Sequence, residues 1–166
     1  QGLGLRVWAV DPVRKHDFVE YVDFETGLRA ADIVVCAMNL TAANRGFFDY
    51  GRFAQARPGL LFVNIARGEL SPPADLLRLL TEGRLGGVGL DVYDEESRLA
   101  VALRGGATCD HPSVRAILAM RELPNVILTP HNAFNTLESV DRKAEQSLQQ
   151  VTHFLTQGSF LWTLPE

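Results

Sequence analysis

Residues 60–92 read LLFVNIARGELSPPADLLRLLTEGRLGGVGLDV and hold two apolar runs on either side of a helical pattern. The apolar runs, Leu60–Ile65 and Gly87–Val92, show little alternation between polar and apolar residues. Such runs are typical of parallel strands that are buried on both faces of a sheet. The stretch therefore predicts a strand–helix–strand unit within a parallel sheet.

The helix between these two strands has signals at both ends. Ser71 is a candidate cap, Pro72 suits the first turn, and Gly83 is a stop signal. Three leucines between these ends give the helix an apolar face: Leu76, Leu77 and Leu80.

The same alternation extends over the rest of the chain. Further strands are predicted at Arg6–Val10, Ile33–Cys36 and Asn125–Thr129. Asp94–Pro124 forms a long excursion with one short helix near Ser113–Met120. A last helix begins after Thr136, and its apolar stripe is Val140, Ala144, Leu148, Val151 and Leu155. This alternation predicts an α/β fold with a doubly wound parallel sheet.

Composition excludes several classes of protein. The 166 residues suffice for one domain with its own core. A net charge of −4 disfavours a nucleic-acid partner, and no apolar run reaches the ~20 residues of a membrane span. Cys36 and Cys109 are too few for a disulfide framework, so we expect a cytoplasmic protein.

Ligands of such sheets bind beyond the carboxyl ends of the strands. The polar residues at or beyond the ends of the predicted strands are Asp11, Asn39, Thr41, Arg67, Asp91, Glu96 and His131. We expect Arg67, Glu96 and His131 to converge at one edge of the sheet.

These three residue types support one kind of chemistry. An arginine binds a carboxylate through two hydrogen bonds, and a histidine gives or takes a proton near neutral pH. A carboxylate beside the histidine favours its protonated form. Together they would hold a small carboxylate-bearing substrate and protonate its carbonyl oxygen while a nicotinamide supplies hydride.

Three motifs carry a family resemblance. Asn64–Gly68, Gly89–Tyr93 and Pro124–His131 resemble, in order and spacing, the motifs of the D-isomer-specific 2-hydroxyacid dehydrogenases. The similarity covers nearly the whole chain and implies a Rossmann-like NAD-binding domain.

The resemblance implies roles for individual residues. Arg67 would bind the substrate carboxylate, His131 would be the acid/base, and Glu96 would be its carboxylate partner. Asp91 would contact the nicotinamide carboxamide, and Asp11 would bind the adenosine ribose and favour NAD over NADP. The full set expected at the cofactor is Asp11, Asn39, Thr41, Ala66, Asp91 and Ala133. The implied substrate is a small 2-keto or 2-hydroxy acid, and the implied assembly is a homodimer through this domain.

The sequence departs from the family in three places. Ser97 stands where a proline often follows the glutamate, and Ala133 stands where a glycine is common. The segment Gly2–Val7 has Val7 in place of the third glycine of a phosphate loop, and the predicted strand follows it instead of preceding it. We therefore expect the first strand and the phosphate loop to precede residue 1, and these 166 residues alone to bind NAD weakly.

The resemblance also sets domain limits and a subclass. Residues 1–135 would be a partial dinucleotide-binding domain, and residues 136–166 a helix and tail that cross back to a substrate domain. The long excursion and Phe134 resemble the D-lactate dehydrogenase branch. Two alternatives stay open: an NAD-sensing scaffold like the C-terminal-binding corepressors, which share this fold and triad, and an inactive fragment.

Each candidate also has a structural interpretation. His131 could be a capping or core histidine, and Arg67 a surface arginine. The acidic run Asp94–Glu96 could be a solvated turn, and Asp11 could start a turn with Pro12. Residues 109–111 (Cys-Asp-His) read as a loop, so no metal site is predicted; His16 and His153 read as surface residues.

Overall fold

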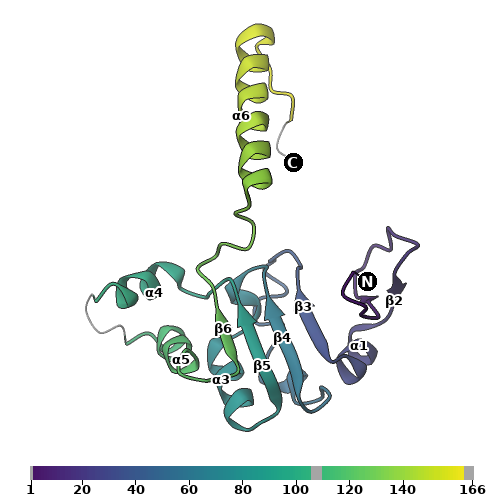
Figure 1. Cartoon of the computed structure of the whole chain (residues 1–166), viewed down its shortest axis with the longest axis vertical. Helices are drawn as coiled ribbons and strands as arrows, with labels where there is room; N and C mark the ends of the chain where they lie inside the picture. Colours follow the sequence, from purple (N-terminus) through teal and green to yellow (C-terminus); the bar gives the residue numbers. More distant parts are fainter. Residues whose placement is uncertain (1, 106–109, 163–166) are drawn as a thin grey trace. The chain divides into compact units, whose positions relative to one another are not determined.

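A computed structural model describes residues 2–105 and 110–162 of the chain. The chain divides into two compact units, Gln1–Pro130 and His131–Glu166 (Figure 1).

The first unit is built on a four-stranded parallel sheet in the order β3-β4-β5-β6. The strands are β3 (Ile33–Cys36), β4 (Leu60–Asn64), β5 (Leu85–Leu90) and β6 (Val126–Leu128). Across the sheet, Val35 pairs with Val63, Val63 with Gly89, and Gly89 with Ile127. The predicted α/β fold with a parallel sheet is confirmed.

Helices cover one face of this sheet. They are α1 (Phe24–Ala30), α2 (Tyr50–Phe53), α3 (Pro73–Thr81), α4 (Glu96–Leu103) and α5 (Pro112–Met120), with a 3-10 turn, η1, at Gly68–Leu70. Helix α3 packs against β5, α5 and α2. The core between these layers is aliphatic and aromatic, with Phe62, Leu76, Leu79, Val114 and Met120 fully buried.

The prediction that the strands are buried on both faces was wrong. Residues on one face of the sheet are exposed: Val35 is 56%, Leu61 42% and Ile127 70% accessible. These residues share the face opposite to Phe62, since side chains alternate along a strand. The composition of the strands is that of a sheet covered on both faces, whereas the first unit covers one.

The prediction of a strand at Arg6–Val10 was too long. Only β1 (Trp8–Ala9) is a strand there, and it pairs in parallel with β2 (Glu20–Tyr21), which was not predicted. These four residues form a separate sheet on the β3 side of the first unit (Figure 1). Neither strand pairs with β3.

The helix predictions need two corrections. Ser71 does not cap α3: its hydroxyl accepts a hydrogen bond from Asn64 Nδ2 at 2.9 Å, and Pro72 precedes the helix. The excursion after Asp94 holds two helices, α4 as well as the expected α5. Cys109, which the sequence placed in a loop, lies outside the described residues.

The second unit contains one long helix, α6 (Leu137–Gln157). Thr136 caps it by accepting from Ser139 N at 3.2 Å, which confirms the predicted start, and Gly158 ends it with a φ of 72°. The chain after Gly158 folds back within this unit, where Phe160 stacks on Phe154 at 4.6 Å between ring centroids. None of the described helices is both long and apolar enough to cross a membrane.

Candidate active site

Parallel strands end at a common edge, and the carboxyl ends of β3, β4 and β5 bring several predicted site residues to that edge. Asn39 follows β3, Arg67 follows β4, and Asp91 and Glu96 follow β5. The structure therefore gathers these side chains at the place where such sheets bind ligands.

Asn64 shapes the loop that presents Arg67. Its side chain is fully buried at the end of β4. Its Oδ1 accepts from Ala66 N at 3.0 Å, and its Nδ2 donates to Arg67 O at 2.9 Å and to Ser71 Oγ. The Arg67 side chain is exposed, and its Nη1 donates to Ala66 O at 2.7 Å. The guanidinium is thus offered to solvent from a loop whose backbone is held by a buried amide.

Gly68 brings this loop against the end of β5. A Cβ at position 68 would lie 1.9 Å from the carbonyl carbon of Tyr93 and 2.1 Å from Asp94 N. Only a glycine permits this approach of two backbones. The loops that carry Arg67 and Glu96 consequently touch each other.

Asp91 is a buried carboxylate at this edge, 5% exposed. Its Oδ1 accepts from Thr129 Oγ1 at 2.6 Å, and its backbone N–H donates to Asn64 O. Thr129 directly follows β6, so the bond ties the ends of β5 and β6 together.

Tyr93 forms a second tie between the same strand ends. Its hydroxyl donates to Thr129 O at 2.6 Å and lies 3.0 Å from Leu90 O. Burial, and then the charges of Asp91 and Glu96, raise the pKa of Tyr93 to about 12, although the Thr129 contact lowers it. The hydroxyl therefore keeps its proton, and its role as a donor, through the neutral range.

The three acidic residues after Tyr93 each have a different partner. Asp94 accepts from Ser113 Oγ at 2.8 Å, and Glu95 pairs with Arg98 at 2.8 Å. Glu96 begins α4, and its Oε1 accepts from Tyr93 N at 3.2 Å. Glu95 precedes α4 in a left-handed conformation with a φ of 61°, which turns the chain between Asp94 and Glu96. The run is therefore an ordered turn and helix start in which Glu96 is directed back toward the end of β5.

A hollow of about 240 Å³ lies beside this turn. Its lining includes Gly68, Glu69, Asp94 and Ser113, at the starts of α3 and α5. None of the predicted catalytic residues lines it.

The loop after β3 carries Asn39 and Thr41 and is closed by Asn44. The Asn44 side chain donates to Asn39 O at 2.8 Å and accepts from Thr41 N at 2.7 Å. Sequence reasoning selected Asn39 and Thr41 but missed Asn44, which fixes the loop.

Asp11 lies apart from these residues along the chain, after β1. Its Oδ1 accepts from Val13 N at 2.7 Å, so one carboxylate oxygen closes the turn with Pro12 that the structural interpretation expected. The side chain is exposed.

His131 and Ala133 belong to the second unit. His131 has a positive φ of 52°, rare for a residue other than glycine, and its ring meets the edge of Phe134 at 6.2 Å. Lys143 Nζ lies 4.0 Å from the centre of the Phe134 ring. Phe134 thus contacts both a histidine and a lysine of its own unit.

Asn64, Tyr93 and Thr129 were the residues that sequence reasoning missed as supports of the site. Asn64 had a signal, because it is a polar residue at the end of an apolar strand. Within residues 2–105 and 110–162, no group of three or more His, Cys, Asp or Glu side chains could hold a metal ion.

Comparison with known proteins identifies relatives of this chain. The family described as "D-isomer specific 2-hydroxyacid dehydrogenase, NAD binding domain" matches residues 1–133. A D-specific alpha-keto acid dehydrogenase of Enterococcus faecalis is 31% identical over 93% of this chain and 46% of its own length. A D-lactate dehydrogenase of Streptococcus agalactiae is 32% identical over 96% of this chain and 48% of its own length.

A solved structure is also similar. The D-lactate dehydrogenase of Lactobacillus jensenii, crystallised with NAD+, has a TM-score of 0.84 and 26% identity, and the match covers 99% of this chain and 50% of that one. The chain spans about half the length of the curated relatives it matches. The chain belongs to the D-isomer-specific 2-hydroxyacid dehydrogenases and represents their NAD-binding domain, as the three sequence motifs predicted.

Proposed function

We propose that the protein containing this chain is an NAD-dependent dehydrogenase that interconverts a small 2-keto acid and the D-2-hydroxy acid, with D-lactate as the favoured product. The observation that carries the proposal is the contact of Gly68 with the Tyr93–Asp94 backbone. It joins the loop that carries Arg67 to the loop that carries Asp91 and Glu96, at the ligand-binding edge of a parallel sheet.

The residues of the chain suit two parts of a dinucleotide. Asp91 is a buried acceptor at the carboxyl end of β5, and Asp11 is an exposed carboxylate after β1. In the proposal, Asp91 holds the carboxamide of the nicotinamide and Asp11 accepts from the ribose hydroxyls. Asn39, Thr41, Ala66 and Ala133 complete the set expected at NAD. When bound, the cofactor supplies hydride.

The proposed catalytic roles follow from residue chemistry. Arg67 binds the substrate carboxylate with its solvent-facing guanidinium. His131 gives a proton to the carbonyl oxygen during reduction and takes it back during oxidation, and Glu96 favours the protonated histidine.

The proposal also covers domain limits, assembly and location. We place the domain limits at residues 1–135 and 136–166, and we propose a homodimer through the NAD-binding domain. We also propose a cytoplasmic location, which fits a chain with only two cysteines. Burial raises the pKa of the Cys36 thiol, which makes that thiol less reactive.

The test is turnover by the full-length protein. NADH oxidation is followed with pyruvate and with longer 2-keto acids. We expect His131→Ala to abolish most turnover in both directions, and Arg67→Lys mainly to raise the KM for the keto acid, since lysine lacks the two-pronged contact. NADH binding without turnover of any 2-keto acid would refute the proposal and favour a sensing scaffold.

A further inference from the structure

Tyr93 contacts three structural elements of the first unit at the carboxyl edge of the sheet. Its carbonyl carbon would lie 1.9 Å from a Cβ at Gly68, the residue next to Arg67. Its backbone N–H donates to Glu96 Oε1 at 3.2 Å, and its hydroxyl donates to Thr129 O at 2.6 Å. One residue thus contacts the Arg67 loop, the Glu96 carboxylate and the end of β6.

The hydroxyl of Tyr93 closes a ring of hydrogen bonds with Thr129 and Asp91. Thr129 accepts from Tyr93 through its carbonyl oxygen and donates to Asp91 through its own hydroxyl at 2.6 Å. Residues 91–93 complete the ring along the chain. Thr129 N also donates to Leu90 O at 2.9 Å, so three hydrogen bonds fix Thr129 to the end of β5.

We propose that Tyr93 is a positioning residue for the dehydrogenase reaction, and that it acts with Thr129 to fix Asp91, Glu96 and the segment leading to His131. The inference deepens the proposed function and rests on it. Tyr93 contacts the segments that hold the proposed catalytic residues. It is not itself a catalytic residue, since its hydroxyl points at two backbone carbonyls.

The proposal explains why a tyrosine is placed where a phenylalanine would fill the same space. The ring is half-buried and could pack without its oxygen. The hydroxyl adds a donor for Thr129 O, which a phenylalanine would lack.

The experiment compares Tyr93→Phe, Thr129→Val and the double variant in the full-length enzyme. Tyr93→Phe keeps the ring and the backbone N–H that holds Glu96, and it removes only the hydroxyl. We expect kcat for 2-keto acid reduction to fall about tenfold, with little change in the KM for the keto acid, because Arg67 is untouched. Thr129→Val should act similarly, and the double variant should lose less than the product of the two, because both changes open one ring.

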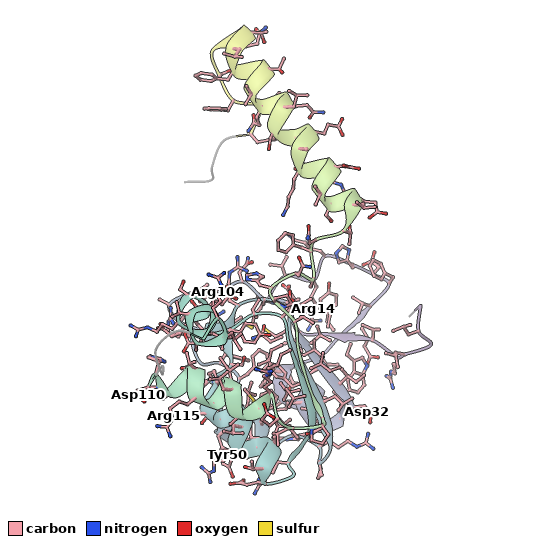
Figure 2. The ribbon with its side chains drawn as sticks, turned by 60° about the vertical axis from the view of Figure 1, so that its left-hand side comes forward. Arg14, Asp32, Tyr50, Arg104, Asp110 and Arg115 are labelled. Carbon is pink, nitrogen blue, oxygen red and sulfur yellow. The ribbon has the colours of Figure 1, made fainter. Side chains whose placement is uncertain are left out.

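Two controls separate positioning from loss of folding. Tyr50→Phe removes a hydroxyl that donates to Glu82 at 2.7 Å, three residues before β5 begins and therefore at the other end of the sheet. Figure 2 labels Tyr50 on the same lower side as Asp32, which directly precedes β3. We expect the Tyr50→Phe variant to leave kcat unchanged. Thr129→Ser keeps the hydroxyl and should restore most of the kcat that Thr129→Val loses.

The outcomes are distinguishable. An active wild type with Tyr93→Phe kinetics equal to those of Tyr50→Phe would overturn the inference and leave the proposed function intact. If the fold-loss of kcat in the double variant equals the product of the two single losses, the hydrogen-bond ring does not couple Tyr93 to Thr129. A wild type that turns over no 2-keto acid would overturn the proposed function and the inference together.

Discussion

Predicted site residues lie in two different settings: at the ends of β4 and β5, and in the turn after β1. At β4–β6, the residues that hold the loops include the buried Asn64 and the half-buried Tyr93, and bonds from Tyr93 and Thr129 link separate strands. After β1, Asp11 is exposed, and its bond to Val13 spans two residues.

The difference lies in how far each bond reaches along the chain. Tyr93 and Thr129 are 36 residues apart, so their contact exists only in the folded unit. The Asp11 turn needs only its neighbours in the chain, so its hydrogen bond does not depend on the sheet. The geometry at the ends of β4 to β6 should therefore depend on the folded sheet, whereas the turn after β1 should tolerate substitution.

Gly68→Ala should give the largest effect and tests the region at β4–β6 most directly. The added Cβ meets the backbone of Tyr93 and Asp94, which cannot rotate away as a side chain could. We expect unfolding free energy to fall by about 3 kcal/mol or more in denaturant titration. Gly51→Ala is the matched control: it lies in α2, its nearest neighbour is the Asp49 side chain at 3.5 Å, and it should be neutral or slightly stabilising. Equal stability of the two variants would show that the strand ends are not held together there.

Asn64→Ala should come next in size. It leaves a cavity and removes the partners of Ala66 N, Arg67 O and Ser71 Oγ. We expect a loss of about 2 kcal/mol, measured in the same titration. Asn125→Ala removes an exposed amide that donates to Gly86 O at 3.0 Å, and it should cost well under half as much. Similar losses would mean that burial does not distinguish these two amides.

The sequence predicted the sheet but not the bonds that complete the site. Apolar runs and turn residues located β3 to β6 within a few residues, because those signals are local. The contacts of Tyr93 with Thr129 and of Gly68 with Tyr93 join segments far apart in the chain, so no local pattern encodes them. The strands at residues 8–9 and 20–21 were hard to predict for a different reason, because a two-residue strand leaves almost no periodic signal in the sequence.

The environment of Tyr93 at the ends of β5 and β6 can also be tested by alkaline titration. Its pKa of about 12 in the folded state lies above the ordinary 10.0, so the folded state favours the neutral hydroxyl. This contribution to stability is complete below pH ~10 and is lost as the pH rises from there through about 12. Absorbance of tyrosinate should show an ionisation step near pH 12, and Tyr93→Phe should remove that step. A step near pH 12 that persists in Tyr93→Phe would show that it does not belong to Tyr93.

Asp11→Ala should have the smallest effect on stability and a distinct effect on cofactor choice. The variant loses one exposed hydrogen bond, so we expect unfolding free energy to change by no more than about 0.5 kcal/mol. In the full-length enzyme, loss of the carboxylate removes an acceptor for the ribose hydroxyls and the repulsion of a 2′-phosphate, so the ratio of kcat/KM for NADPH to that for NADH should rise. Asp17→Ala is the matched control, because it removes an exposed carboxylate from the same loop and should leave the ratio unchanged. If Asp11→Ala leaves the ratio unchanged as well, Asp11 serves its turn with Val13 and does not read the cofactor; if it destabilises the fold as much as Asn64→Ala, the two regions are not different in the way their bonds suggest.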